Sequence, residues 1–487
     1  MNLNLSSVFR IIGVAVAVIG ICMLPSVIVS FIYDDSSVYI PFLITMLSSC
    51  AAGFILTAIC KYRMHQLKVR DGFLIVTLCW LISAVLGAIP FVITDSIPHF
   101  ADAFFESCSG FSTTGSTVLA KPELLPRGIL FWRSFTHWIG GMGILIFAIA
   151  LMPSLGISGQ NIAVSEAPGP SLDKVTPKMS DTAKALYLIY LLFTILETIL
   201  LLLGGMNLYD SLITTFGSVG TGGFSNYSDS LGHFDSTYIR MVVTAFMFLC
   251  GVNFNLYYIS MKRGLKTFMR DSEFKMYLLI FAAASMFIFA ALLISGCYDS
   301  ALPAFSDSVF QVSSILTTTG FITADYETWP MICQMVLLML MFIGGCSSST
   351  GGGLKVVRIL ILLKLIKRGI STRLHPNIVE SIKLDGKIIP ADAVSAIVNH
   401  FFLYLAMLFA GAFIVSFENA DIITCFSSVI TCLGNIGPGF GAVGPTDNFG
   451  TLSVLSKYLL SIYMLAGRLE LYTMFIILTP RFWNPDR

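Results

Sequence analysis

Long apolar runs recur along the whole chain, and they constrain its fold more than any other feature. Stretches of about 20 apolar residues alternate with short polar loops from one end of the sequence to the other. A helix of that length crosses the hydrocarbon core of a bilayer, so the pattern predicts a helical protein with many membrane spans. The composition agrees, because 56% of the 487 residues are hydrophobic and only 12% are charged, which is about half the charged fraction of a soluble domain.

We expect ten spanning segments. They cover residues 8–33, 38–60, 72–95, 128–153, 184–205, 237–260, 275–296, 331–365, 392–417 and 452–480. The first apolar stretch, 11–32, is long and lacks a small-residue cleavage site, so it predicts a membrane anchor and not a signal peptide.

Basic and acidic residues lie in alternate loops. The basic residues follow the second, sixth and eighth predicted spans, as Lys61, Arg63, Lys68, Arg70, Lys262, Arg263, Lys266, Arg270, Lys275, Lys355, Arg358, Lys364, Lys367, Arg368 and Arg373. The opposite loops carry Asp34, Asp35, Asp299, Asp307, Glu418 and Asp421. By the positive-inside rule, both chain termini are predicted to be cytoplasmic.

A polar motif that ends in glycine recurs in the acidic loops. It is DAFFESCSGFSTTGS at 102–116, DSLITTFGSVGTGGFS at 210–225 and DSVFQVSSILTTTGF at 307–321. In each copy an aspartate precedes a glycine by 13 residues, in the pairs Asp102/Gly115, Asp210/Gly223 and Asp307/Gly320. Repetition at this spacing indicates one structural unit used several times.

A fourth and looser copy, DIITCFSSVITCLGNIGPG, covers 421–439. Gly434 keeps the 13-residue spacing from Asp421. The ending Asn435–Ile436–Gly437, however, has the polar-x-glycine pattern of the other copies. We therefore expect Gly437 to be the equivalent glycine, with Gly434 as the alternative.

Each motif begins with an apolar part that is long enough to enter a bilayer but too short to cross it. Such a segment predicts a re-entrant pore helix followed by an extended loop that is enclosed by protein. The fold class is therefore an all-α polytopic membrane protein, with four fused helix–pore-loop–helix repeats in a pseudo-fourfold ring plus two extra N-terminal transmembrane helices. The two extra helices occupy 1–70, and the repeats occupy 71–155, 183–262, 274–368 and 391–482.

We predict that the four loops form a selectivity filter for a monovalent cation. An ion that leaves water must exchange its hydration shell for other oxygens, and the backbone carbonyls of glycine-ended loops supply them. The predicted ligands belong to Thr113, Thr114, Gly115, Thr221, Gly222, Gly223, Thr318, Thr319, Gly320, Asn435, Ile436 and Gly437. The aspartates that begin the motifs are expected mainly to cap the pore helices, and secondarily to attract cations.

The eighth predicted span, 331–365, is too long for one plain helix and is interrupted by GGCSSSTGGG. Glycines and hydroxyl residues do not sustain a rigid lipid-facing helix. We predict a flexible loop beneath the filter that blocks the pore until it moves, and a kink for packing is the alternative. The gate residues are Cys346, Ser347, Ser348, Ser349, Thr350, Gly351, Gly352 and Gly353.

Arg468 is a cation in the middle of the last span, where a charge is costly and by default functional. Four short segments align: WIGG at 138–141, LCGV at 249–252, FIGG at 342–345 and LAGR at 465–468. This alignment predicts that Arg468 lies near the pore axis as a barrier below the filter. A structural salt bridge to Glu470 or Glu197 is the alternative, and Glu197, Arg133 and His137 are expected to satisfy buried partners.

The sequence resembles the TrkH branch of the Trk/Ktr/HKT potassium transporters over essentially its whole length. The resemblance rests on HWIGGMGILIF (137–147), GGCSSSTGGGLKVVR (344–358), NIGPGFG (435–441) and GRLELYT (467–473). It implies potassium uptake with K⁺ as the transported ion, a homodimer in the bacterial inner membrane, and a cytoplasmic ring of nucleotide-binding regulatory subunits of the TrkA kind, of the NAD or ATP/ADP type. With one common glycine per repeat we expect moderate selectivity, and a sodium-permeable or cation-symporting relative is the alternative.

The sequence carries no pattern for an enzyme or an organic cofactor. A hydrolase needs one nucleophile and one base, whereas the polar motif here recurs fourfold, and an organic-solute transporter normally shows inverted repeats. The 11 cysteines form no CxxC pair and the 6 histidines show no metal-ligand spacing. The net charge is +1, and the basic residues are distributed among separate loops, so they form no continuous basic patch that could bind nucleic acid. Nucleotide control must then come from a partner, for which the basic segments 262–275 and 364–387 are the predicted docking surface.

Overall fold

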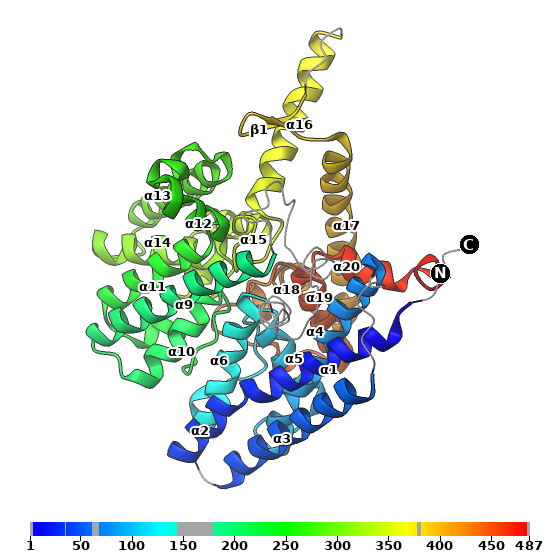
Figure 1. The fold of residues 1–487 in the computed structure, drawn as a ribbon. Coiled ribbons are helices and arrows are strands. Elements are labelled where there is room, and N and C mark those ends of the chain that lie inside the picture. Colours follow the sequence, from blue (N-terminus) through cyan, green and yellow to red (C-terminus); the bar gives the residue numbers. More distant parts are fainter. Residues whose placement is uncertain (1–2, 35, 61–67, 144–178, 377–380, 485–487) are drawn as a thin grey trace.

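Almost every regular element in the described part of the protein is a helix, most of them α-helices and the rest short 3-10 helices (Figure 1). The computed structural model describes residues 3–34, 36–60, 68–143, 179–376 and 381–484. Within these residues the only sheet is a hairpin of β1 (Lys383–Leu384) and β2 (Lys387–Ile388). The all-α architecture predicted from the sequence is confirmed.

Three helices at the N-terminus form a group at one edge of the molecule (Figure 1), and they are α1 (Leu5–Cys22), α2 (Leu24–Tyr33) and α3 (Ser36–Ile59). The first and third pack closely because small residues meet where they cross. A Cβ added at Gly53 would lie 2.5 Å from the Gly13 carbonyl oxygen. Close backbone approach between small residues is a common way for helices to associate in a membrane.

The rest of the chain contains the same group of helices four times. Each group is a long helix, a shorter helix and a second flanking helix. The groups are α4 (Val69–Ile93), α5 (Phe100–Phe111) and α6 (Arg127–Gly141); α9 (Met179–Leu203), α10 (Leu208–Val219) and α11 (Thr237–Cys250); α13 (Ser272–Ser295), α14 (Ala301–Leu316) and α15 (Met331–Ile343); and α17 (Ala391–Val415), α18 (Ile422–Gly434) and α19 (Val454–Arg468). The exact repeat boundaries stay predictions, and residues 144–155 of the first repeat lie outside the described residues.

The middle helix of each group is too short to cross a bilayer and is enclosed by protein. In α5, 10 of the 12 residues are buried, and in α18 the buried residues number 10 of 13. Twelve helical residues span about 18 Å, little more than half of the hydrocarbon core. Their lengths and burial agree with those expected of the predicted pore helices.

Ten spanning segments were predicted from the sequence, of which the eighth was expected to be interrupted. Among the described residues, six helices are long and apolar enough to cross a membrane, or up to eight if each of two bent pairs is one span. The predicted span 237–260 bends by 86° between α11 and α12 (Phe254–Arg263). The span 452–480 bends by 113° after α19, before Tyr472–Leu478. The span 128–153 is described only as far as residue 143.

The predicted span 331–365 is also broken. Its first helix, α15, ends at Ile343, and α16 (Val356–Leu374) begins after an irregular loop. The far part of α16 extends away from the other helices (Figure 1), whereas the β1–β2 hairpin packs on α16 and α17, because Leu384 is buried in one cluster with Ile361 and Ile397. The short segments α20 (Tyr472–Phe475), η10 (Ile476–Leu478) and α21 (Pro480–Trp483) complete the C-terminal part.

Candidate ion pathway

The four segments that follow the pore helices share one backbone conformation. The first and third residue of each segment have positive φ, with 55° and 85° at Thr113 and Gly115, 53° and 77° at Thr221 and Gly223, 58° and 84° at Thr318 and Gly320, and 55° and 106° at Asn435 and Gly437. Gly434 is instead the last residue of helix α18. The fourth segment therefore matches the other three at Gly437.

The four segments meet one another in a closed ring, which glycine makes possible. A Cβ on Gly115 would lie 2.1 Å from the Gly222 carbonyl oxygen, and one on Gly223 would lie 2.1 Å from that of Thr319. Continuing round the ring, a Cβ on Gly320 would lie 2.1 Å from the Ile436 oxygen. A Cβ on Gly437 would lie 2.9 Å from the Thr114 oxygen, which closes the ring.

The amide groups of these segments bond back to the pore helices. The N–H of Thr114 donates to Ser109 O at 2.9 Å, and the N–H of Thr319 donates to Ser314 O at 2.8 Å. The equivalent bonds in the other two copies are Gly222 N–H to Gly217 O at 2.7 Å and Ile436 N–H to Thr431 O at 2.9 Å. With the N–H groups held by the helix ends, the carbonyl oxygens remain as the polar groups that can face an ion.

Side chains brace the ring between its first and fourth segments. The Asn435 amide donates to Thr114 Oγ1 and to Met464 O, both at 2.9 Å. The Ser116 hydroxyl donates to Gly437 O at 3.0 Å. Because each of these side chains is buried, the bonds fix the distance between neighbouring segments.

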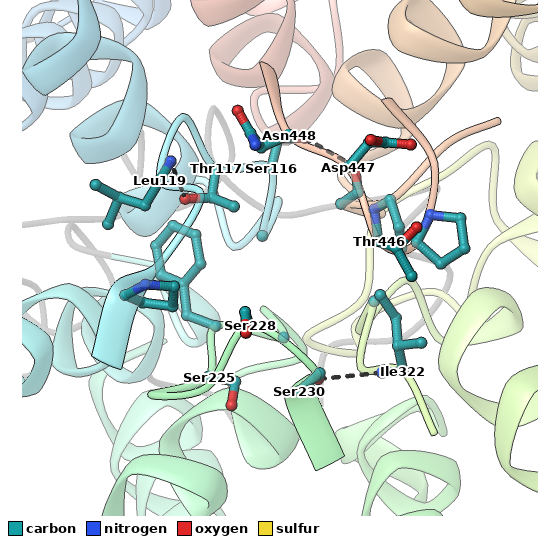
Figure 2. Close-up of a pocket in the computed structure, with 18 of the residues that line it drawn as sticks. Ser116, Thr117, Leu119, Ser225, Ser228, Ser230, Ile322, Thr446, Asp447 and Asn448 are labelled. Carbon is teal, nitrogen blue, oxygen red and sulfur yellow. Dashed lines mark hydrogen bonds between the residues drawn. The ribbon is translucent and has the colours of Figure 1, made fainter. Parts of the chain in front are cut away.

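A small polar vestibule opens beside the ring, with residues from all four outer loops in its wall. Its cavity volume is about 80 Å³. Figure 2 shows hydroxyl and amide side chains around it, including Ser116, Ser225, Thr446 and Asn448, with the carboxylate of Asp447 on the same rim. Hydroxyls and one exposed acid suit the partial dehydration of a cation before it reaches the carbonyl ring.

The aspartates of the four motifs do not all cap their helices, which corrects the expectation from the sequence. Only Asp421 is an N-cap, where its side chain accepts from the N–H of Thr424. Asp210 and Asp307 lie inside their helices. Asp102 likewise lies in the first turn of α5, and its carboxylate is 2.6 Å from Lys457 Nζ.

Asp210 and Asp307 instead tie α10 and α14 to the loops that follow segments 221–223 and 318–320. The carboxylate of Asp210 accepts from Asn226 at 2.8 Å and from Tyr227 at 3.1 Å. Asp307 accepts from Thr323 at 2.9 Å. Burial and the neighbouring Asp210 charge raise the pKa of Tyr227 to about 12, so its hydroxyl keeps the proton that it donates.

The predicted gate residues form an irregular loop, 344–355, that lies against the inner ends of the pore helices. The N–H of Gly352 donates to Thr318 Oγ1 at 2.6 Å. A Cβ on Gly351 would lie 2.7 Å from Thr317 O, and one on Gly352 would lie 2.3 Å from Gly434 O. The loop therefore lies directly across the ring from the vestibule, where small residues allow the close approach.

Glu273 at the start of α13 holds both ends of this loop. Its carboxylate accepts from the N–H and the hydroxyl of Ser347, each at 2.6 Å, and from the N–H of Val357 at 3.2 Å. The loop also bonds to the bend after α11, through Cys346 N–H to Gly251 O at 2.8 Å. The sequence analysis missed Glu273, and its only signal was an acid beside a predominantly basic loop.

Arg468 bonds to the loop and to the first repeat. Its guanidinium donates to Thr350 O at 2.6 Å, to Gly140 O at 2.7 Å and to Gly141 O at 2.6 Å. These bonds join the fourth repeat to the third and the first. The sequence analysis did not predict these partners.

In the described contacts, Glu470 and Glu197 bond to other residues and not to Arg468, which corrects the two partners named for a salt bridge. Glu470 pairs with Arg358 of α16. Glu197 is buried and accepts from Ser218 at 2.6 Å, in agreement with the packing role expected for it. Lys355, which the charge pattern counted among the basic residues that follow the eighth predicted span, is instead buried, and it donates to Gly351 O within the loop.

No group of His, Cys, Asp and Glu side chains among the described residues could hold a metal ion. The oxygen-rich ring is thus the strongest candidate site for an ion in this part of the chain.

A family model named TrkH, and described as a cation transport protein, matches residues 41–483. The chain belongs to the TrkH family. Members of this family are cation transport proteins and not enzymes.

Relatives match the chain over its full length. The Trk system potassium uptake protein TrkH of Salmonella typhimurium is 38% identical over 486 residues, covering 99% of this chain and 100% of the relative. The protein of the same name from Vibrio parahaemolyticus is 38% identical over 484 residues, covering 98% and 99%. The crystal structure of the potassium transporter TrkH from Vibrio parahaemolyticus superposes with a TM-score of 0.89 at 36% identity, covering 99% of this chain and 100% of that one. The resemblance noted in the sequence is confirmed.

Proposed function

We propose that this protein takes up potassium ions across the cell membrane through a central pore whose filter is the ring of four glycine-ended segments. The filter carbonyls are those of residues 113–115, 221–223, 318–320 and 435–437. Full-length relatives named as potassium uptake proteins support the choice of ion. Carbonyls in a closed ring replace the hydration shell of a monovalent cation without proton transfer or covalent chemistry.

One observation carries this proposal, which is that each filter glycine faces a carbonyl of the next segment so closely that no Cβ fits. If the ring served packing alone, larger apolar residues would fill the space better than these glycines. It exposes carbonyls at the cost of four strained positions with positive φ at non-glycine residues.

The test is the flux of potassium, rubidium and sodium into proteoliposomes, with Gly320→Ser beside the parent. The added Cβ would lie 2.1 Å from Ile436 O, so the ring must shift. Overpacking costs about 1–3 kcal/mol, and we expect the potassium-to-sodium flux ratio to fall about tenfold. Gly296→Ser is the control, because Gly296 also has positive φ but nothing lies within 4 Å of its Cβ position.

An unchanged flux ratio in Gly320→Ser would contradict the filter assignment. Equal potassium and sodium fluxes in the parent would instead favour a sodium-permeable transporter of the same architecture. The control separates either outcome from a general effect of strain at a glycine.

The gating and assembly of the protein extend this proposal. The 344–355 loop and Arg468 would block the inner side of the ring until a cytoplasmic nucleotide-binding subunit of the TrkA kind moves them. Relatives are named as parts of a Trk system, which supports a partner. We propose that the protein forms a homodimer in the bacterial inner membrane, with both termini of each chain in the cytoplasm. The regulatory subunit would bind segments 262–275 and 364–387, whose residues 377–380 lie outside the described ones.

A further inference from the structure

Two polar residues of α6, Arg133 and His137, lie one helical turn apart and both contact the filter segment of the next repeat. Arg133 has 2% of its surface exposed and His137 has none. The sequence alone suggests that such groups satisfy buried partners. In the structure those partners lie partly on α5 and partly in residues 222–225, which include the end of the second filter segment and the two residues after it.

His137 connects the first pore helix to the second filter segment. Its Nδ1 is 2.8 Å from Gly110 O, and its Nε2 is 3.3 Å from the backbone nitrogen of Phe224. A carbonyl oxygen only accepts, so Nδ1 carries the proton and Nε2 accepts from the Phe224 N–H. The imidazole is therefore neutral, and it lies where a Cβ on Gly222 would be 2.2 Å from the ring.

Arg133 holds the same segment from the outer side. Its guanidinium lies 3.6 Å over the centroid of the Phe224 ring and donates to Ser225 O at 2.8 Å. Its Nε also donates to Glu106 at 2.5 Å. Glu106 in turn accepts from the hydroxyl of Thr117 at 2.9 Å, just after the first filter segment. Arg133 and Glu106 thus join the outer ends of two filter segments.

The other three repeats have no such pair at the matching positions. Four residues before Val252, Gly345 and Arg468 lie Phe248, Met341 and Met464, and eight residues before them lie Thr244, Leu337 and Leu460. Apolar side chains or one threonine stand where the first repeat has an imidazole and a guanidinium. The second filter segment is consequently held by contacts of a different kind from those on the other three.

We propose that the Arg133–His137 pair positions the second filter segment and is a determinant of ion selectivity. The inference rests on the proposed filter role of the ring. Both side chains act through the backbone of 222–225 and not by touching an ion, so they are positioning residues. Hydrogen bonds and the stacked guanidinium fix the Gly222 and Gly223 carbonyls relative to the neighbouring segments.

The test compares two amide replacements of His137 that keep different contacts. In His137→Asn the amide nitrogen takes the place of Nδ1 and keeps the bond to Gly110 O, but nothing accepts from Phe224 N–H. In His137→Gln the amide oxygen reaches the place of Nε2 and accepts from Phe224 N–H. A buried hydrogen bond contributes about 1 kcal/mol, so we expect His137→Asn to lower the potassium-to-sodium flux ratio about fivefold. We expect His137→Gln to stay close to the parent.

Arg133→Lys tests the second member of the pair. Lysine keeps the positive charge beside Glu106 but loses the planar stack on Phe224 and the directed bond to Ser225. We expect a fall of about fivefold in the flux ratio. The double variant should lose less than the product of the single losses, because both residues hold one segment. Met341→Leu, at the position of His137 in the third repeat, is the matched control and should leave the ratio unchanged.

The outcomes separate this inference from the filter proposal. A parental flux ratio in His137→Asn, together with a lowered ratio in Gly320→Ser, would refute the positioning role and leave the filter in place. Parental ratios in both would refute both proposals. A ratio lowered equally in His137→Asn and His137→Gln would also overturn the inference, since a general packing defect predicts that result. If neither His137 variant folds, Phe224→Leu removes the ring that the pair covers, and a loss of about threefold is expected from the cation–π contact alone.

Discussion

Arg468 is a partly buried cation that bonds to backbone oxygens of two other repeats, one of them in the predicted gate loop. It donates to three carbonyl oxygens, one in the 344–355 loop and two at the end of α6. Hydrogen bonds from a charged group contribute about 1.5–3 kcal/mol each. A charge that a permeating cation approaches within about 4–6 Å opposes it by several kcal/mol when poorly screened. The hydrogen bonds that hold the loop and the repulsion of a permeating cation would therefore both oppose conduction.

We predict that Arg468→Ala raises basal flux in proteoliposomes, measured at matched protein density without regulatory subunits. The loop then loses its bond through Thr350 O, and the pathway loses a positive charge. Arg468→Lys separates the two causes, because lysine keeps the charge but lacks the planar fork that reaches several carbonyls at once. The flux of Arg468→Lys should lie between that of the parent and that of Arg468→Ala. A folded Arg468→Ala that conducts at the parental rate would leave this residue a purely structural role.

Glu327 lies in an outer loop and gives the protein a predictable pH dependence. Its carboxylate accepts from the N–H of Gly441 at 2.5 Å. Burial raises the pKa of Glu327, and the nearby charges of Asp325, Asp447 and Asp421 add to the rise. A carboxyl whose pKa is raised by folding contributes stability below its unfolded pKa, and that stability is lost as the pH rises through the raised value.

We predict that Glu327→Gln is more stable than the parent at about pH 8 and that the difference disappears toward about pH 4. Glutamine stays neutral and still offers an oxygen to Gly441 N–H. The gain in melting temperature should be about 1–2 °C for a chain of this size. Glu123→Gln, which also removes one outer-loop carboxylate, is the control. A difference between Glu327→Gln and the parent that is the same at both pH values would contradict the assignment.

At the scale of elements, the 344–355 loop closes on itself at its base. The N–H of Lys355 donates to Ile343 O at 2.9 Å, and the N–H of Val356 donates to Gly345 O at 3.0 Å. The ends of α15 and α16 are therefore held together independently of the residues between them. Removing the tip of the loop does not require these helices to move.

We predict that deletion of residues 347–353 raises flux in the absence of regulatory subunits. The deletion removes the glycines that approach Thr317 O and Gly434 O, and it leaves the base of the loop intact. The triple variant Ser347→Ala, Ser348→Ala and Ser349→Ala keeps the loop length and should raise flux less. If the deletion variant folds and conducts no more than the parent, the gate lies elsewhere in the protein.

The four short helices α5, α10, α14 and α18 could be predicted from the sequence, because each lies within a copy of the repeated motif. The sequence did not predict the bends after α11 and α19, because tertiary contacts and backbone conformation decide them. Gly251, which caps α11, packs against Tyr277 and Thr317, and Glu470 and Leu471 take positive φ after α19. No residue type reveals a leucine with positive φ in advance.

The candidate site was also predictable only in part. Repetition placed the filter segments and chose Gly437 over Gly434 as the fourth equivalent glycine, although the role of the ring in binding an ion stays a prediction. The partners of Arg468 were not predictable, since they are backbone carbonyls that exist at every residue. Likewise, no spacing rule connects Arg133 and His137 to a segment almost 90 residues later, with which they bond at sequence separations of 92 and 87.

At the scale of the whole molecule, the ring is where all four repeats touch. A cation held by oxygens of all four segments would therefore connect parts of the chain that are otherwise joined by helix packing. A ligand that binds only the folded state adds about 2.7 kcal/mol when its concentration is 100 times its dissociation constant. The stability of the entire protein should thus depend on which cation is present.

We predict that the melting temperature of the purified protein is higher in potassium or rubidium than in sodium or choline at equal ionic strength. For a chain of this length the binding free energy corresponds to about 2–3 °C. Gly320→Ser should lose this potassium-specific gain because its Cβ displaces Ile436 O, whereas Gly296→Ser should keep it. Equal melting temperatures in all four cations would mean that the ring does not hold a potassium ion in the folded protein. A gain that survives in Gly320→Ser would place the ion at another site, because the added Cβ would displace a carbonyl oxygen of the ring.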